Sequence, residues 1–549
     1  MERLQRNAVP ILLGAGFLVA AVLTLVLTKD TTFAGDNWAF LMTRRDPSVH
    51  NLLYPHNEHL VVIPVLIDEL LLRVFGMDSA RPEQVLLVVF LLTTAALLYV
   101  YVKRRVGPWL ALMATLLVLF LGPAWEVLLW PFEITFIGPV MFGLAMLLAL
   151  EREDTKGDVA ACAFLTLGLG FSNLGVAFIP AAAVAVLIGP RERWLRRSYV
   201  FLVPAVLFGI WYLGWGTEAE SHVSLSNVLS SPQFVFESAA VSVGALSGLG
   251  TSAITNVTDS TWGKVLLVAL TLGAVAWKLR HRGPLARWLW PVAAAALANW
   301  FLTAFNLFAG REAAASRYQY IGAIFVLLVL ANVFKGARPS RNALIAFAVV
   351  TALAIGPNLV VLKNGSNVYE EQAALTRADT AAIEIAQRTV DPSFQLTPEI
   401  AGTPSLINIY ASEYLQAVDE YGSPAYSQSE LEAAPAVGRR AADIVLAHAL
   451  PLSVSGVDSR TGSRSGCVVV PGGEATEVTL STPVTRVEAD PGEPAALALR
   501  RFSDPGVYPV NTEGVPGGAA VELDIPRDLS PRPWQLSVDA AQPVRVCPA

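Results

Sequence analysis

The hydrophobic residues of this chain gather in runs of about 20 residues, the length that an α-helix needs to cross a lipid bilayer. Short polar segments separate the runs. Eleven of these runs are therefore predicted to be membrane-spanning helices. They begin near Val9, Val85, Pro108, Ile134, Val159, Val176, Ser198, Lys264, Trp288, Tyr320 and Ala343.

The charges between the runs predict how the helices are oriented, because positively charged loops stay preferentially in the cytoplasm. With eleven spans and a cytoplasmic N-terminus, every basic cluster falls on the cytoplasmic side. These clusters are the N-terminus, Lys103–Arg105, Arg191–Arg197, Lys278–Arg282 and Lys335–Arg341. One missed or extra pair of helices would preserve the alternation, so nine and thirteen spans are alternatives. We expect a multi-pass protein of the cell membrane.

Three long segments fall outside the cell in this topology: the loop 29–83, the loop 217–262 and the tail from Lys363. Within the first loop, the apolar stretch Leu60–Phe75 is short and interrupted by charge, which predicts a helix lying in the membrane interface. Pro232–Leu249 in the second loop is predicted to be another such helix.

The tail changes character along its length. Residues 363–450 are rich in Ala, Glu and Gln and predict helices, whereas residues 451–549 show short Val- and Leu-rich runs between Pro and Gly turns, the spacing of a β-sandwich. We therefore predict three parts: a transmembrane domain over 1–362, a helical extracytoplasmic segment over 363–450 and a β-sandwich over 451–549. The expected fold is a polytopic α-helical membrane protein with an extracytoplasmic α+β domain.

Composition agrees with a membrane protein, since 54% of the residues are hydrophobic and 15% are charged, against about 25% charged residues in soluble domains. From Lys363 onward, 13 basic and 24 acidic residues give a net charge of −11. Because the whole chain carries −6, the preceding part carries +5. An acidic soluble part argues against nucleic acid as a partner.

Two of the three cysteines, Cys467 and Cys547, lie in the tail, where an oxidising environment would let them form a disulfide from the first strand of the sandwich to the last. Two unrelated free thiols are the alternative. Cys162 lies in an apolar run and is expected to be inert packing.

No nucleotide-binding loop, dinucleotide fingerprint, CxxC, GxSxG or HExxH motif occurs in the chain. This argues against ATP or a redox cofactor bound by these motifs. The predicted spans hold few ionisable residues, and chiefly Asn173, Asn299 and Asn306 are polar candidates within them. The candidate chemistry therefore lies at the outer ends of the helices.

The first candidate is Asp36, in the sequence AGDNW shortly after the first span. A carboxylate at the membrane surface can act as a general base on an acceptor hydroxyl, or bind a cation that holds a phosphate. Gly35 lets the backbone approach a ligand and Trp38 offers a stacking face. The alternatives are a solvated turn and a helix N-cap, both of which favour Asp.

Further along the same loop, the HNEH sequence holds His56, Glu58 and His59. These side chains can shape a cavity or bind a divalent metal ion, and the alternative is that they cap the helix that follows. Arg44 and Arg45 suit a phosphate, although adjacent arginines outside a helix commonly face water.

Two other outer loops carry unexpected charge. The short loop after the third span holds Glu126 and Glu133, and the loop before the tenth holds Arg311, Arg317 and Tyr318. Arginines in an outer loop run against the usual bias, and a phosphate at the outer interface would explain them. Contact with lipid headgroups without specificity is the alternative.

Taken together, this layout resembles the GT-C glycosyltransferases, which are membrane enzymes that use polyprenyl-phosphate-linked sugars. The resemblance covers the whole arrangement and rests on AGDNW, HNEH and SRYQY (Ser316 to Tyr320). It is closest to actinobacterial members with an extracytoplasmic, carbohydrate-binding-like C-terminal domain. In the family the loop aspartate is the catalytic or cation-binding acid, and Asp36 matches it. Many members have a paired acid there, whereas Asn37 follows Asp36 here, so a divalent metal cofactor stays open.

The resemblance implies transfer of a sugar to a cell-envelope glycan or glycolipid by a single, inverting displacement. Asp36 would be the base, and Arg311 with Arg317, or Arg44 with Arg45, would hold the phosphate. His56, Glu58 and His59 would shape the sugar pocket, with Glu133 and Tyr318 as further substrate-binding candidates. Membrane lipid is an expected partner. The alternatives are a non-catalytic scaffold that binds envelope polysaccharide and a flippase for lipid-linked sugars.

Overall fold

The computed structural model describes residues 2–46, 48–249, 260–308, 310–402, 406, 409–457 and 466–549. The chain divides into two compact units that differ in secondary structure. The helical unit comprises Met1–Lys29, Asp46–Leu71 and Arg81–Val368. The mixed unit comprises Asp30–Arg45, Leu72–Ala80 and Tyr369–Ala549.

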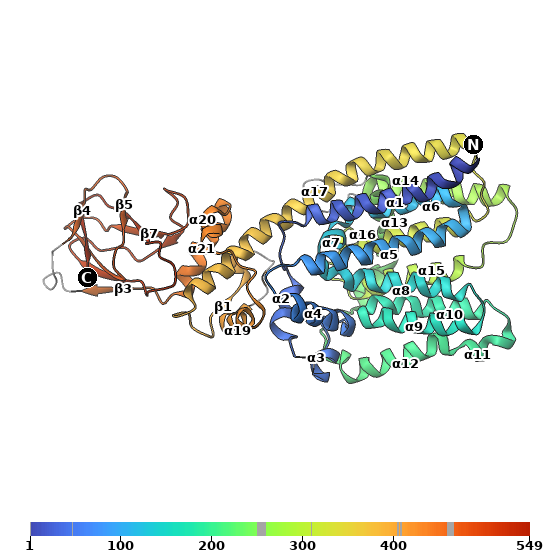
Figure 1. Ribbon diagram of the computed structural model, residues 1–549, viewed down its shortest axis with the longest axis horizontal. Coiled ribbons are helices and arrows are strands. Elements are labelled where there is room, and N and C mark those ends of the chain that lie inside the picture. The colour runs from blue at the N-terminus through green and yellow to red at the C-terminus, as the bar shows by residue number, and fades with distance from the viewer. Residues whose placement is uncertain are drawn as a thin grey trace. The chain divides into compact units, whose positions relative to one another are not determined.

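The helical unit is built from long helices that run alongside one another (Figure 1). Short 3-10 turns join several of them. The helices are α1 (Glu2–Leu27), α3 (Val49–Leu53), the first part of α4 (Val62–Phe75), α5 (Arg81–Val106), α6 (Pro108–Leu119), α7 (Trp125–Leu129), α8 (Ile134–Leu150), α9 (Thr155–Phe171), α10 (Phe178–Leu187), α11 (Trp194–Arg197), α12 (Tyr199–Gly214), α13 (Leu225–Ser247), α14 (Ser260–Arg280), α15 (Leu289–Phe305), α16 (Ser316–Val333) and the first part of α17 (Arg341–Ala386).

Seven helical stretches in the described part of the chain are long and apolar enough to cross a membrane. The pair of α6 with Gly122–Leu129, bent by 48°, would make an eighth. Each of the eleven predicted runs nevertheless carries a helix, and those outside the seven are short, such as α10 and α15. The number of spans therefore stays a prediction.

Small residues set how closely these helices pack. A Cβ atom added to Gly138 of α8 would meet the Phe171 ring at 2.4 Å, and one on Gly143 would meet the Phe178 ring at 2.3 Å. The two glycines thus admit aromatic rings from α9 and α10. Close packing through small residues is the usual way in which membrane helices associate, because lipid leaves little hydrophobic driving force between them.

Buried charges at the helix ends that we predict to face the cytoplasm are paired. Arg105 donates to Glu151 at 2.5 Å and to Asn332 at 2.9 Å. Arg197 forms two bonds with Asp158, at 2.9 and 2.7 Å. Since an unpaired buried charge is costly, the Arg105 bonds fix α5 to the ends of α8 and α16, and the Arg197 pair fixes α11 to the start of α9.

Of the two predicted interfacial helices, one has the expected character. The helix α4 starts at Val62, within the predicted Leu60–Phe75, and exposes Leu66 and Leu70 one turn apart while burying Val65. It is not among the helices that pass as spans in the described residues. A short helix with one exposed apolar face suits the membrane interface.

The other predicted interfacial helix, over Pro232–Leu249, differs from the structure. The helix α13 begins earlier, at Leu225, and its second half is buried by α14, α15 and α16. Small residues cause the difference: a Cβ on Gly263 would meet the Ala240 carbonyl oxygen at 2.1 Å, and one on Gly322 would meet the Ser242 hydroxyl at 2.1 Å. The polar look of α13 comes from serines that pack inside the bundle.

The C-terminal part of the mixed unit is a β-sandwich with two antiparallel sheets (Figure 1). One sheet has the order β3-β9-β6-β11-β4 and the other β5-β10-β7-β8. The strands are β3 (Ser453–Val457), β4 (Val468–Val470), β5 (Thr476–Thr479), β6 (Val484–Ala489), β7 (Ala496–Arg500), β8 (Val510–Asn511), β9 (Ala520–Asp524), β10 (Gln535–Asp539) and β11 (Val544–Pro548). Alternate side chains such as Val487, Leu523, Leu499 and Leu536 fill the core between the sheets.

Helices and a small two-stranded sheet complete the mixed unit. The helices are α2 (Asp36–Thr43), α18 (Pro398–Ala401), α19 (Ala411–Tyr421), α20 (Gln428–Ala433), α21 (Ala436–Ala449) and the last part of α17, and the sheet pairs β1 (Gln395–Leu396) with β2 (Ile409–Tyr410). The helical character expected for 363–450 is thus present. The domain limits at 362 and 450 stay a prediction.

Two stretches of the first outer loop are part of the core of the mixed unit. Trp38 is fully buried, its ring 6.1 Å from that of Tyr414, and its indole N–H donates to the Phe33 carbonyl at 3.1 Å. The N–H of Met77 donates to the Tyr421 carbonyl at 2.6 Å. Trp38 is therefore a packing residue here, and its ring is not available to stack on a sugar.

A disulfide joins Cys467, which directly precedes β4, to Cys547 in β11. The strands β4 and β11 are neighbours in the five-stranded sheet. The bond therefore connects the last strand to an adjacent edge strand and not to β3, which is the first strand of the sandwich.

Removing this disulfide should destabilise the mixed unit. The bond closes a loop with a sequence separation of 80, and loss of such a constraint costs about 2–4 kcal/mol. We expect Cys467→Ser to lower the unfolding temperature of the mixed unit, as measured by calorimetry of the full chain, and added reductant to change this variant no further. Cys162→Ser is the matched control. An unchanged unfolding temperature in Cys467→Ser would contradict the expectation.

Candidate functional site

The HNEH sequence of the first outer loop forms a tight turn in the helical unit. The backbone N–H of His56 donates to the His59 carbonyl at 3.0 Å, and the N–H of His59 returns a bond at 2.9 Å. Asn57 lies between them with a φ of 53°, a left-handed conformation that Asn tolerates better than most residues. The turn presents Glu58 at its tip.

Asn173 holds this turn from the start of the 3-10 turn Asn173–Ala177, more than a hundred residues later in the chain. Its side-chain amide donates to the Glu58 carbonyl oxygen, and its Oδ1 accepts from the Leu60 N–H at 3.0 Å. An amide suits this task because it offers both a donor and an acceptor. The sequence marked Asn173 only as a polar residue within a span, whereas the structure makes it the anchor of the HNEH turn.

Glu58 forms an ion pair with Arg311, which lies in the loop before α16. The two side chains are 22% and 14% exposed. The Nε2 atom of His59 is 3.6 Å from the same Glu58 oxygen, and the Arg311 guanidinium lies 4.4 Å from the Phe308 ring centroid. Burial opposes ionisation of Glu58, but His59 and Arg311 outweigh it and lower the pKa of this carboxyl below its ordinary value.

A second pair, Glu126 with Arg317, joins the first turn of α7 to the first turn of α16. The Oε2 of Glu126 is 3.3 Å from the Arg317 Nε. The backbone N–H of Glu126 also donates to the Ser316 hydroxyl at 3.1 Å. Two consecutive residues of α16 therefore set the position of Glu126, which sequence reasoning noted but did not include among the candidate site residues.

Tyr318 connects the two pairs, since it interacts electrostatically with Arg311, Arg317, Glu58 and Glu133. Glu133 is 1% exposed and belongs to the turn Pro131–Glu133. In the same turn, the Phe132 ring lies 5.5 Å from that of His56. We call this set the polar cluster: His56, Glu58, His59, Glu126, Glu133, Arg311, Arg317 and Tyr318.

The polar cluster thus gathers seven of the residues predicted from sequence, together with Glu126, from three separate loops of the helical unit. Guanidinium groups can bind a phosphate once it replaces their carboxylate partners, and carboxylates and imidazoles can accept or donate protons. The polar cluster therefore holds groups for phosphate binding and groups for proton transfer together. Outer loops of membrane proteins usually carry few basic residues, so Arg311 and Arg317 stood out in a segment predicted to lie outside.

The other three predicted residues lie in the mixed unit. Asp36 is the first residue of α2 and follows Gly35, whose φ is 54° and ψ is −124°. That conformation strongly favours glycine, as the expected turn requires. Arg44 is buried at the end of α2, and Arg45 lies 3.9 Å from Glu420. The adjacent arginines are thus not both directed to water, the alternative considered from sequence.

A divalent metal was an open question. No group of three or more His, Cys, Asp or Glu side chains in the described residues is arranged to hold a metal ion. Within the polar cluster, Glu58 is engaged by the Arg311 guanidinium, which does not fit the environment of a cation. We therefore derive no step through a metal.

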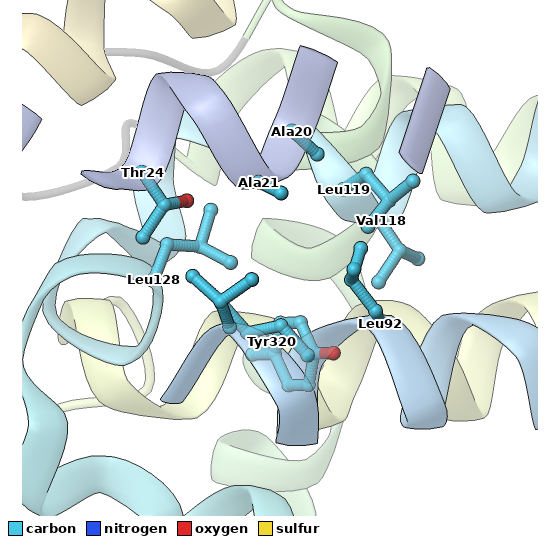
Figure 2. Close-up of a pocket in the computed structure, with 10 residues that line it drawn as sticks. Ala20, Ala21, Thr24, Leu92, Val118, Leu119, Leu128 and Tyr320 are labelled. Carbon is cyan, nitrogen blue, oxygen red and sulfur yellow. The ribbon is translucent and has the colours of Figure 1, made fainter. Parts of the chain in front are cut away.

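The helical unit also contains a small hollow between α1, α5, α6, α7 and α16 (Figure 2). Its lining is mostly aliphatic, with the hydroxyl groups of Thr24 and Tyr320 among Ala20, Leu92 and Leu128. The hollow has about 10 Å³ of space, which accommodates at most one water molecule. It is a packing defect and not a sugar pocket.

Comparison with known proteins gives one family match. The profile of the dolichyl-phosphate-mannose-protein mannosyltransferase family, PMT_2, matches residues 62–215. The expected resemblance to GT-C glycosyltransferases is confirmed over this range. The range runs from α4 to α12 and includes Glu126, Glu133 and Asn173.

Among solved structures, the arabinosyltransferase EmbB from Mycobacterium smegmatis is similar, with a TM-score of 0.35 and 13% sequence identity. The match covers 96% of this chain and 64% of EmbB, so the chain spans less than two thirds of the length of that protein. No curated protein matches the chain.

Loss of the Asn173 side chain should loosen the HNEH turn. In Asn173→Ala, the Glu58 carbonyl and the Leu60 N–H lose their partner, which costs about 1–3 kcal/mol where such groups are buried. We expect faster hydrogen exchange of the Leu60 amide by mass spectrometry. Asn51→Ala is the control, since its exposed amide donates to the Asp46 carbonyl within the same loop, away from the HNEH turn's bonds to Asn173. Equal exchange in both variants would show that Asn173 does not hold the turn.

Proposed function

We propose that this chain is a membrane glycosyltransferase that moves a sugar from a polyprenyl-phosphate donor to a cell-envelope glycan or glycolipid outside the cell. The N-terminus would lie in the cytoplasm, and the mixed unit outside. One observation carries the proposal: Arg311, in the loop before α16, and Arg317, in the first turn of α16, share a polar cluster with carboxylates and histidines at the ends of apolar helices. The match to a mannosyltransferase family over residues 62–215 supports it.

The reaction needs two kinds of group. The acceptor hydroxyl oxygen attacks the anomeric carbon of the sugar, the bond from that carbon to the phosphate oxygen breaks, and the electron pair leaves with the polyprenyl phosphate. A base takes the hydroxyl proton. Positive charge stabilises the phosphate, whose negative charge grows as the bond breaks.

The arginines of the polar cluster supply that positive charge in this proposal. His56, Glu58, His59, Glu133 and Tyr318 would bind the sugar and its surroundings. Asp36 is the proposed base on the family resemblance, as the acid of the first outer loop at the start of α2. The β-sandwich would bind the polysaccharide acceptor.

Replacement of the proposed base tests the mechanism. Asp36→Asn keeps the shape of the side chain but cannot accept the proton, so we expect transfer of labelled sugar from a polyprenyl phosphate to fall by about 10²–10⁴-fold. Asp46→Asn, in the same loop, is the matched control and should keep its activity. Full transfer by a folded Asp36→Asn protein would rule out Asp36 as the base, and a scaffold would tolerate the change in a complementation assay.

A single displacement also fixes the stereochemistry. The acceptor oxygen enters opposite the departing phosphate, so the new glycosidic bond should have the anomeric configuration inverse to that of the donor. NMR of the product from a donor of known configuration measures this directly. Retention would instead point to a covalent intermediate and a second nucleophile.

A further inference from the structure

The two Arg–Glu pairs of the polar cluster differ in how firmly the arginine is held. Arg311 is 14% exposed and lies between the Glu58 carboxylate and the Phe308 ring. Glu58 itself sits at the tip of the turn that Asn173 anchors. Contacts on both sides therefore fix the guanidinium of Arg311, which makes this arginine suited to positioning the loops.

Arg317 is more accessible. Its side chain is 39% exposed, and its Nε approaches Glu126 at 3.3 Å, a longer contact than a tight charged bond of about 2.8 Å. Arg317 is therefore better placed than Arg311 to exchange its carboxylate partner for an incoming ligand.

The place occupied by the Glu126 carboxylate suits an anion for two reasons. It lies beside the Arg317 guanidinium, and it lies at the first turn of α16, where Ser316 binds the Glu126 backbone. The amino end of an 18-residue helix such as α16 carries a partial positive charge that favours negative groups. A phosphate would satisfy the same two requirements.

We propose that Arg317 receives the phosphate of the polyprenyl donor and that Glu126 is its built-in competitor, which the phosphate replaces. This inference rests on the proposed function. Before the donor binds, the negative charge of Glu126 offsets the positive charge of Arg317. On binding, the phosphate takes over the guanidinium. As the sugar leaves, the phosphate changes from one negative charge to two, so its attraction to Arg317 increases toward the products.

The competitor role makes an unusual prediction about affinity. Glu126→Gln removes the competing charge while keeping the size of the side chain, so the protein should bind farnesyl phosphate about three- to tenfold more tightly. Arg317→Gln should weaken binding by at least about tenfold, since a charge-assisted bond is lost. Binding is measured by titration of the full chain in phosphatidylcholine nanodiscs.

The matched control is Glu312→Gln. Glu312 is an exposed acid in the same loop as Arg311, and its carboxylate accepts from the Gly310 N–H at 3.1 Å. This variant removes the same charge without touching Arg317, so its affinity should match the wild type. Ser316→Ala tests the competitor role independently, because it removes the hydroxyl that accepts from the Glu126 backbone N–H. We expect this variant to bind farnesyl phosphate more tightly than the wild type, by a smaller factor than Glu126→Gln.

The possible outcomes separate the two proposals. If wild-type protein does not bind farnesyl phosphate, or binds farnesol equally well, the proposed function fails. If it binds, but Glu126→Gln behaves like Glu312→Gln or Arg317→Gln keeps full affinity, the competitor role fails and the proposed function stands. An equal gain of Glu126→Gln for phosphatidylglycerol added to the nanodiscs would make this a lipid-headgroup site and overturn the inference.

Discussion

The ion pair between Glu58 and Arg311 is the interaction on which the polar cluster depends, because it joins loops that lie some 250 residues apart in the chain. A half-buried arginine needs a partner, or the cost of removing it from water is not offset. Here the partner is placed by backbone geometry: Asn57 adopts a left-handed conformation and Asn173 holds the turn. The charge pair thus converts a local turn into a long-range constraint.

The helices below the cluster make that constraint possible. Glycines on α8, α14 and α16 let neighbouring helices approach until only a hydrogen atom fits between them, so the loops at their ends meet in fixed positions. The buried pairs Arg105–Glu151 and Arg197–Asp158 fix helix ends elsewhere in the same unit. Close packing of the apolar helices therefore holds the loops that carry the polar cluster in fixed positions.

Sequence patterns predicted most of the long helices and most of the candidate site residues. They missed the features that depend on contacts between distant parts of the chain. Hydrophobic run length located eleven helices of the helical unit, because a helix that crosses lipid needs about 20 apolar residues in a row. The serine-rich α13 was misjudged, since packing of small residues leaves no hydrophobic signal. The arginines stood out as exceptions to a charge rule. Pairing of Glu126 with Arg317 could not be foreseen, because nothing local in the sequence records a partner 191 positions away.

The mixed unit is discontinuous in sequence, and this has a consequence for how the chain is made. Residues 30–45 and 72–80 are synthesised first, yet Trp38 and Met77 belong to a core that is completed by residues after Tyr369. During translation these apolar side chains have no lasting partner until nearly three hundred further residues have been added. Folding of this unit is therefore a late, high-contact-order event. A fragment that begins at Tyr369 would leave the ring face of Tyr414 uncovered, and would lack part of its own hydrophobic core.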